Sequence, residues 1–421
     1  MLEEPKSRWE RVAPFIAGGA LLAVLAGAGI AAIAPKLKLP ERPASAEIAV
    51  AVAGSEPEAV VEPTDTAPQN TWIEWQADKP LNTYRVGGLE FSFRPVVDDG
   101  LNAARMRVST ADGVSTELTG QALSWVARAD FAVVQLDAKV PQRQVLFSSF
   151  SGGAHCCTSL TLLEVEDGAW RATDLGQWDG DTPALPQDVD GDGVKEFLFV
   201  DQSFLYAFDS YAGSWAPTVV MTVSDGRVRD VSAQSRFRSI YQRDLPEMRE
   251  ACGERANGAC AAYVATAARV GQLDQAWAYM LRSYDQTSDW TYPSACRVRT
   301  ADQCPAEAEF KFATFPEALQ WFLGEVGYTP PSYVEPWQAR GPSFSCGAAR
   351  KASEKTICAS GELSSLDRLM ARAYTRATAL TADRAALRAS QREFLSVRDE
   401  TSDEAILRAA YAARIRQLAA V

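Results

Sequence analysis

The hydrophobic pattern changes its period near residue 232, and this change restricts the folds open to the chain more than any other feature. Between residues 72 and 232, short runs alternate apolar and polar side chains and are separated by turn residues. Such alternation is typical of strands that bury one face. From about residue 235 onward, apolar residues recur at helical spacing. We therefore expect an α+β multidomain protein, with an antiparallel β domain followed by helices.

The β-rich region, residues 72–232, is predicted to be an antiparallel sandwich or a fragment of a propeller-like sheet. Its clearest expected strands cover residues 89–93, 131–136, 143–147, 160–165, 197–200 and 219–223.

A helical connector is expected over residues 233–338. Two helices, at 261–270 and 273–281, should form a hairpin in which Gly271 ends the first helix. A third helix is expected at 315–323, because Pro316 suits the first turn of a helix.

Residues 13–34 carry no charge and form the expected membrane anchor. As a helix this stretch would be about 33 Å long, enough to cross a bilayer core of ~30 Å. We assign residues 1–12 to a cytoplasmic tail, 13–35 to a transmembrane helix and 36–71 to a Pro- and Ala-rich linker. A cleaved signal peptide is the alternative, because Ala44-Ser45-Ala46 has the small-x-small form of a cleavage site.

The eight cysteines are even in number and form four close pairs, which suits an oxidising compartment. Equal numbers of basic residues flank the apolar stretch on its two sides, so the positive-inside rule does not decide its orientation. The cysteines do, because they place the C-terminal bulk outside the cytosol. They therefore predict a single-pass inner-membrane protein whose bulk is periplasmic. Pairing within Cys252/Cys260 and Cys296/Cys304, or between these two pairs, remains open at this stage. The cysteines are Cys156, Cys157, Cys252, Cys260, Cys296, Cys304, Cys346 and Cys358.

Composition excludes some classes of function. A net charge of −12 argues against nucleic acid as the main partner. His155 is the only histidine, so a histidine base for hydrolysis would have to be this residue. We therefore predict that the chain is not an enzyme.

The acidic loop, residues 188–196, carries the strongest chemical motif. It has the sequence Asp-Val-Asp-Gly-Asp-Gly-Val-Lys-Glu, with oxygen-bearing side chains at alternate positions. Calcium takes six to eight oxygen ligands, so a tight loop of carboxylates suits it. The alternative is a solvated hairpin turn. The expected Ca²⁺ ligands are the side chains of Asp188, Asp190, Asp192 and Glu196 and the carbonyl of Val194.

This loop resembles the calcium loops of FG-GAP repeats in β-propellers. An EF-hand would need a glutamate where Phe199 stands, and a helix where a strand is expected. FG-GAP loops usually carry Asp where this chain has Glu196. Only one such loop occurs, so the resemblance does not extend to a full propeller.

His155 stands beside Cys156 and Cys157, which permits a metal or thiol site. Neighbouring residues of a strand point to opposite faces, so one ion could not be bound by all three without a bend. A strand end with disulfides is the simpler alternative.

Residues 346–418 carry a dispersed motif that resembles the LprI-like family of bacterial envelope proteins. One founding member of that family inhibits lysozyme. The resemblance implies a small helical bundle stapled by a Cys346–Cys358 disulfide. The motif comprises Cys346, Ser353–Cys358, Leu363, Leu366, Asp367, Leu369, Tyr374, Gln391–Leu395, Arg398, Asp399, Tyr411 and Arg414.

The resemblance implies a short helix at Cys358 and further helices at about 362–380, 382–399 and 403–419. Relatives usually carry a tryptophan at the position of Phe394, and a second cysteine pair after Arg398-Asp399. Because this chain lacks that pair, the last two helices are expected to be held by packing alone.

The C-terminal domain, residues 340–421, has 14 Lys and Arg against 9 Asp and Glu. Its arginines recur every four residues and line helix faces. They are either a solvated face or a docking surface for an anionic partner. The candidate partner-binding residues are Arg368, Arg372, Arg376, Arg384, Arg388 and Arg392.

Together these features predict a membrane-anchored cell-envelope binding protein with a calcium-stabilised β domain. Its expected partner is an envelope protein or an anionic lipid surface, and a lysozyme is one candidate. Lysozyme is basic, so it matches a basic module poorly. A structural scaffold without a dedicated ligand is the alternative, followed by an unrecognised periplasmic enzyme.

Overall fold

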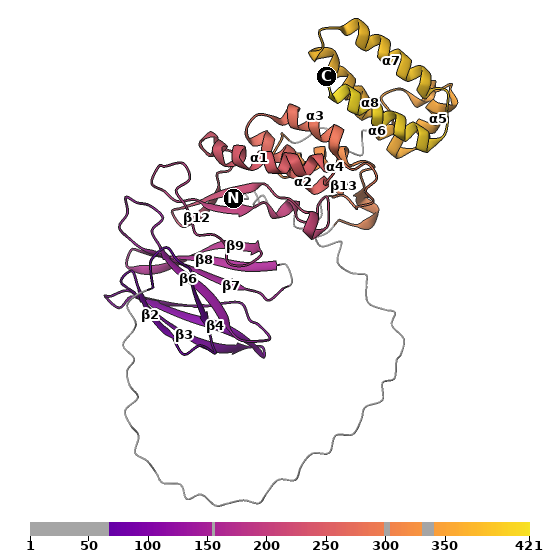
Figure 1. Cartoon of the computed structure of the whole chain (residues 1–421). Coiled ribbons are helices and arrows are strands. Elements are labelled where there is room, and N and C mark those ends of the chain that lie inside the picture. The colour runs from indigo at the N-terminus through magenta and orange to yellow at the C-terminus, as the bar shows by residue number, and fades with distance from the viewer. Residues whose placement is uncertain (1–66, 154–155, 299–303, 331–340) are drawn as a thin grey trace, which may run out of the picture.

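The computed structural model describes residues 67–153, 156–298, 304–330 and 341–421. A body of β-sheets lies at one end of the molecule and helices fill the other (Figure 1). The expected α+β class, with antiparallel sheets and a helical C-terminal region, is confirmed.

The expected tail (1–12), anchor (13–35) and most of the linker (36–71) lie outside the described residues, and so does His155. Among the residues that are described, no helix has both the length and the apolar character needed to cross a bilayer.

The first sheet has four antiparallel strands in the order β2–β3–β4–β5. The β2–β3 hairpin turns at Gly87 and Gly88, whose φ values are 60° and 83°. A type I′ turn needs positive φ at both positions, which glycine adopts at little cost. The strands are Thr83–Val86, Leu89–Asp98, Leu101–Ser109 and Ser115–Thr119.

The second sheet has five antiparallel strands in the order β1–β6–β7–β8–β9. Its strands are Ile73–Gln76, Arg128–Val134, Gln144–Phe150, Cys156–Glu166 and Ala169–Asp179.

These two sheets pack face to face. Phe91 and Phe93 of β3 contact Phe131 of β6, with ring centroids 4.6 and 5.1 Å apart. The opposite face of the second sheet packs Leu146 and Leu160 against the third sheet. The second sheet is therefore covered on both sides, which explains why β7 is buried along almost its whole length.

The third sheet joins the β body to the helices. It contains β10 (Phe197–Val200), β11 (Thr218–Ser224) and β12 (Arg227–Asp230). Phe237 and Tyr241 pack against Val220 of β11. This separate hydrophobic cluster fixes the helical part of the chain to the third sheet.

The connector contains α1 (Arg238–Gly253), α2 (Asn257–Arg269), α3 (Leu273–Ser283) and α4 (Phe315–Glu325). Gly271 follows α2 with a φ of 78°, as expected for a residue that ends a helix.

Two disulfides lie in the connector, and both close locally. Cys252 pairs with Cys260, joining the end of α1 to the start of α2. Cys296 pairs with Cys304 beside the short ribbon of β13 (Ala295–Cys296) and β14 (Glu309–Phe310).

The terminal bundle contains α5 (Ala352–Ala359), α6 (Gly361–Leu380), α7 (Arg384–Arg398) and α8 (Glu404–Ala419). These bounds lie within a few residues of the expected helices. Ser360, Asp383 and Asp403 begin the three long helices, and each side chain accepts a hydrogen bond from a main-chain N–H of the first turn.

The connector and the terminal bundle share one hydrophobic core. Phe322 and Leu323 of α4 belong to the same buried cluster as Leu369 of α6 and Leu418 of α8. The Oγ1 of Thr314, just before α4, lies 2.9 Å from the Oγ of Ser365 in α6. The bundle is thus packed onto the connector over an apolar contact.

Candidate functional site

The acidic loop is folded by its own aspartates. Asp188 accepts hydrogen bonds from the main-chain N–H groups of Gly191 (2.8 Å) and Gly193 (3.0 Å). Both glycines have positive φ, 81° and 91°, which side-chain-bearing residues rarely adopt. An antiparallel bridge between Gln187 and Glu196 closes the loop, and strand β10 follows it, as expected.

Three carboxylates of the loop converge. One oxygen each of Asp188, Asp190 and Glu196 lies within 4.8 Å of the others. Asp192 is not a member of this group. Val194 lies opposite Asp137 in an antiparallel bridge, which fixes its main chain beside the loop.

Glu196 is the most unusual member of the cluster. Its side chain is 0% exposed. The Oε2 atom accepts a hydrogen bond from the Val189 N–H at 3.1 Å, whereas Oε1 has no hydrogen-bond partner in the described part of the chain. Burial raises the pKa of this carboxyl. A buried carboxylate oxygen without a partner costs free energy that a cation would recover.

Arg236 forms ion pairs with two aspartates of the loop. Its Nη1 lies 2.9 Å from Asp190 and 2.7 Å from Asp192. Arg236 sits in the short turn before α1, so the loop is tied to the start of the connector. Sequence patterns could not predict this contact, because the partners are more than forty residues apart and no periodicity links them.

The arginines expected to form a docking surface have three different environments. Arg368 pairs with Glu317 of α4 at 2.6 Å and donates to the carbonyl of Gly341, so it joins the bundle to the connector. Arg372 and Arg376 line a cavity. The three on α7 are exposed on the outer surface of the bundle: Arg384, Arg388 and Arg392.

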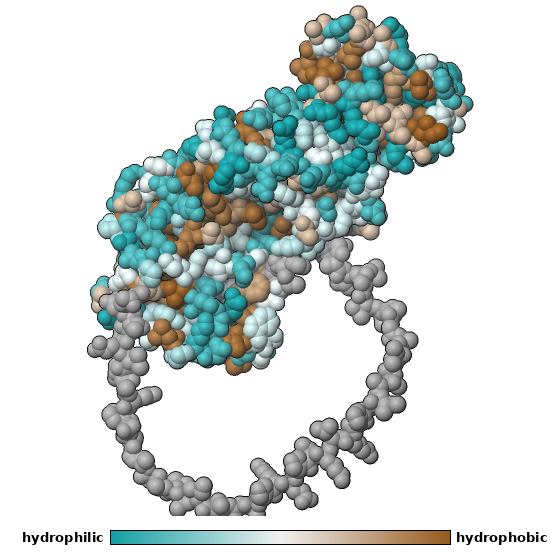
Figure 2. Space-filling view, viewed as in Figure 1, coloured by the Kyte–Doolittle hydropathy of each residue, from teal (hydrophilic) through white to brown (hydrophobic). Residues whose placement is uncertain are grey.

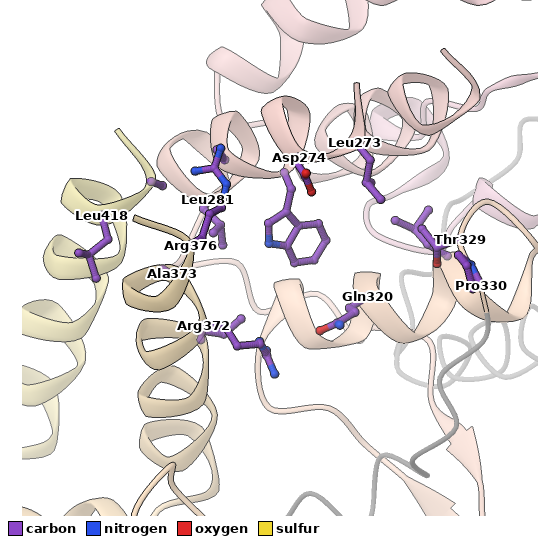
Figure 3. A pocket seen from close by; sticks show the side chains of 15 residues that line it. Leu273, Asp274, Leu281, Gln320, Thr329, Pro330, Arg372, Ala373, Arg376 and Leu418 are labelled. Atoms are coloured by element: carbon purple, nitrogen blue, oxygen red, sulfur yellow. The ribbon is translucent and has the colours of Figure 1, made fainter. Parts of the chain in front are cut away.

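A cavity of about 400 Å³ lies where α3, α4, α6 and α8 meet. Arg372 and Arg376 project from α6 on one side, and Gln320 projects from α4 (Figure 3). Thr329 lies toward the end away from α6, and Asp274 projects from α3 on the side toward which Arg376 is directed. Sequence patterns could not reveal this site, because it exists only where the connector and the bundle meet.

The polar residues of the LprI-like motif form buried contacts within the bundle. Tyr411 of α8 donates a 2.8 Å hydrogen bond to Asp367 of α6. Asp367 also accepts from the main-chain N–H of Ser343 at 2.6 Å. Arg398 and Asp399 form an ion pair at 2.6 Å, and Asp399 accepts from Ser353 near the start of α5. These motif residues therefore position the helices.

The expectation that packing alone holds α7 and α8 together is wrong. Arg414 of α8 donates hydrogen bonds to Gln391 (3.0 Å) and Ser390 (3.1 Å) of α7. Hydrogen bonds as well as packing therefore link α7 to α8.

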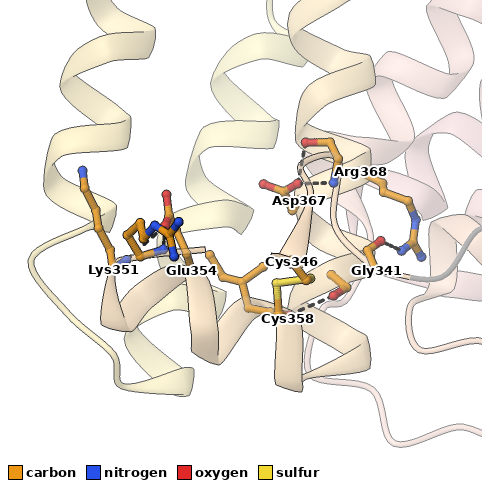
Figure 4. Close-up of a disulfide and its surroundings, with 11 residues drawn as sticks. Gly341, Cys346, Lys351, Glu354, Cys358, Asp367 and Arg368 are labelled. Carbon is orange, nitrogen blue, oxygen red and sulfur yellow. Dashed lines mark hydrogen bonds between the residues drawn. A yellow bond between two sulfur atoms is a disulfide. The ribbon is translucent and has the colours of Figure 1, made fainter. Parts of the chain in front are cut away.

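Cys346 and Cys358 are joined by a disulfide (Figure 4). It ties the segment before α5 to the end of that helix, close to Asp367 and Arg368. Cys157 is also disulfide-bonded, and none of the described cysteines is free.

The fold and its cross-links thus define a disulfide-stabilised α+β protein with a helical domain built on a β-sandwich. A family model described as the sll0997 C-terminal domain matches residues 234–327, the segment from Arg236 through α4. The match ends before residue 346, so the LprI-like resemblance of the terminal bundle stays a prediction.

Two proteins are similar over longer stretches. A probable thylakoid lumen protein, sll0997, of Synechocystis sp. is 37% identical over 205 residues, which are 47% of this chain and 59% of that protein. The uncharacterized protein y4bJ of Sinorhizobium fredii is 32% identical over 289 residues, 66% of this chain and 44% of that protein. The chain spans about half the length of these curated relatives. No solved structure matches.

Proposed function

We propose that the chain is a binding protein of a lumenal or periplasmic-type compartment, held at the inner membrane by residues 13–35. Three disulfides, including Cys252–Cys260, support an oxidising compartment. The printed name of the cyanobacterial relative, a probable thylakoid lumen protein, supports the same kind of compartment.

The surface of α7 carries this proposal. Arg384, Arg388 and Arg392 are exposed, and within the described residues none of them has an ion pair or side-chain hydrogen bond. Large apolar side chains are also exposed on the bundle, among them Val397 and Ile406. Figure 2 shows apolar patches on the bundle among hydrophilic residues. Cationic and apolar side chains together suit an anionic envelope partner, either a lipid surface or an acidic protein.

The charged groups of the bundle favour a binding function over a catalytic one. Asp367, Arg398 and Asp399 are buried or half-buried and are engaged in helix-to-helix contacts. Such groups fix the positions of the helices, and their charges are used in contacts within the protein.

The test replaces Arg384 and Arg388 by Glu in the full-length chain. Binding to vesicles that contain phosphatidylglycerol should fall at least tenfold, and added salt should weaken wild-type binding. The control reverses Arg227 and Arg229 of β12, which are also exposed arginines. Equal binding by both double variants would overturn the proposal and favour a structural scaffold.

A second experiment, with lysozyme as the partner, tests the alternative that the chain is a lysozyme-inhibitor-like protein. Lysozyme is basic, so an inhibitory contact would use acidic or apolar groups. The same α7 reversal should then leave lysozyme binding unchanged or strengthen it. Loss of lysozyme activity on adding the chain would support the LprI-like assignment of the bundle.

We also propose that the acidic loop binds Ca²⁺ and stabilises the β domain. The observation behind this is the unpartnered, buried Oε1 of Glu196 beside the carboxylates of Asp188 and Asp190. These three side chains would hold the ion, and Val194 could add its carbonyl. Asp192, which we expected to be a ligand, pairs with Arg236 and lies outside the cluster.

A further inference from the structure

The cavity between the connector and the bundle has the size of a small-molecule site. Its volume of about 400 Å³ falls within the range of known ligand pockets, roughly 300–1,000 Å³. Four helices contribute to it, α3, α4, α6 and α8. A ligand here would touch both the segment that matches the sll0997 C-terminal domain and the terminal bundle.

Most of the cavity wall is apolar. Leu273 and Trp277 of α3, Leu323 of α4 and Leu369 of α6 line it. Such a wall favours an aliphatic or aromatic body, because burying apolar surface on binding is favourable.

Two arginines give the cavity its charge. Arg372 and Arg376 lie one turn apart on α6 and both line the cavity, with Arg376 directed toward α3 and Arg372 toward α4 (Figure 3). Neither has an ion pair or side-chain hydrogen bond with any residue that the structure describes. Arg368, one turn earlier, is paired with Glu317. The two cavity arginines are therefore available to a ligand, whereas their neighbour is not.

Arg372 keeps its charge in the cavity. Loss of solvent around Arg372 lowers its pKa from the usual value, and the nearby Glu317 opposes that change. An arginine whose pKa falls somewhat below its usual value is still protonated at neutral pH. Among the described residues, Asp274 is the one acidic residue lining the cavity, and it lies on α3, on the side toward which Arg376 is directed (Figure 3).

We infer that this cavity binds a small organic monoanion: a carboxylate with an aliphatic or aromatic body. Arg372 or Arg376 would hold the carboxylate through charge-assisted hydrogen bonds, and the leucines and Trp277 would cover the body. The inference does not rest on the α7 surface, so one can fail without the other.

The experiment titrates the full-length chain with octanoate and decanoate by calorimetry. Decanol, which has the same chain and no charge, and inorganic phosphate, which has charge and no chain, are the matched probes. Decanoate should bind, with affinity rising about fourfold for each added methylene until the cavity is filled. Both matched probes should bind at least tenfold more weakly.

The test variant carries Arg372→Gln and Arg376→Gln together, and it should bind decanoate at least tenfold more weakly than wild type. Arg227→Gln with Arg229→Gln, which changes two exposed arginines of β12 outside both proposed sites, is the control. Arg372→Lys with Arg376→Lys keeps both charges, and should retain part of the affinity even if the Gln pair perturbs folding.

Three outcomes would overturn the inference. The first is no decanoate binding by wild type, and the second is equal affinity for decanol. The third is unchanged decanoate affinity in a folded Arg372→Gln, Arg376→Gln variant.

Discussion

The Nη1 atom of Arg236 lies 2.9 Å from the Oδ2 of Asp190. Asp190 belongs to the converging carboxylates of the acidic loop, and its side chain is only 7% exposed. Arg236 precedes α1. One ion pair therefore links the proposed cation site to the junction between the β body and the helices.

Calcium should stabilise the wild-type chain. At a hundredfold excess over the dissociation constant, the free energy of unfolding should rise by about 2.7 kcal/mol, because the ion binds only the folded loop. Thermal unfolding of the full-length chain with Ca²⁺ and with chelator measures the effect. Asp190→Ala should abolish it, and Asp98→Ala, at an exposed position outside the loop, should not. Identical wild-type melting curves under both conditions would contradict the site.

Arg236→Ala should make the chain less stable in chelator and more responsive to Ca²⁺. Without calcium, the variant loses a partly exposed ion pair, at a cost of about 1 kcal/mol. When Ca²⁺ is added to the variant, the ion binds Asp190 without competition from the guanidinium of Arg236. The measured quantity is the difference in melting temperature between the two conditions. A smaller difference in the variant than in wild type would show that Arg236 and the cation do not compete.

Tyr411→Phe should destabilise the bundle by about 2 kcal/mol, the usual magnitude for a hydrogen bond to a charged group. The change removes the hydrogen bond to buried Asp367 and keeps the ring that packs on Phe394. Denaturant unfolding followed by circular dichroism measures it. Tyr374→Phe is the control, because its hydroxyl has no hydrogen bond within the described residues. Equal effects of the two changes would argue against a structural role for the Tyr411 hydroxyl.

Asp399 should make the free energy of unfolding depend on pH in the acidic range. Burial alone would raise the pKa of Asp399, but hydrogen bonds from Lys351, Arg398 and Ser353 outweigh burial and lower it. The stabilisation is therefore present above the unfolded pKa of about 3.9 and is lost as the pH falls through the folded pKa. Asp399→Asn should cost about 3 kcal/mol at pH 7, because it leaves buried Arg398 without its counter-charge.

The stability difference between wild type and Asp399→Asn should shrink at acid pH. Denaturant midpoints measured at pH 7, 5 and 3 follow it. If the stability difference stays constant over this pH range, Asp399 has the same pKa in the folded and unfolded states, and the prediction is wrong.

Local patterns predicted most of the elements. The run at 89–93 falls within β3, and the run at 160–165 lies within β8, because alternation reports directly which face of a strand is buried. In the bundle, Asp383 and Asp403 cap α7 and α8 and make the helix starts visible in the sequence. Helix α1 was not identified, because Pro246 lies inside it and argues locally against a helix.

The candidate sites were only partly predictable. Asp188, Asp190 and Glu196 lie within nine residues of each other, so spacing alone brought them together. Arg236 could not be assigned to the loop, because that contact depends on tertiary packing. The same limit explains why equally spaced arginines on α6 have different roles. Helical spacing places Arg368 and Arg372 on one face but does not say which of them meets Glu317.

The core common to α4, α6 and α8 has a consequence for synthesis. A chain made from its N-terminus cannot complete this core until Leu418 has left the ribosome, so Phe322 and Leu323 stay without their final neighbours until translation is almost finished. A premature stop between residues 330 and 341 would release a product with that apolar surface open to chaperones and proteases.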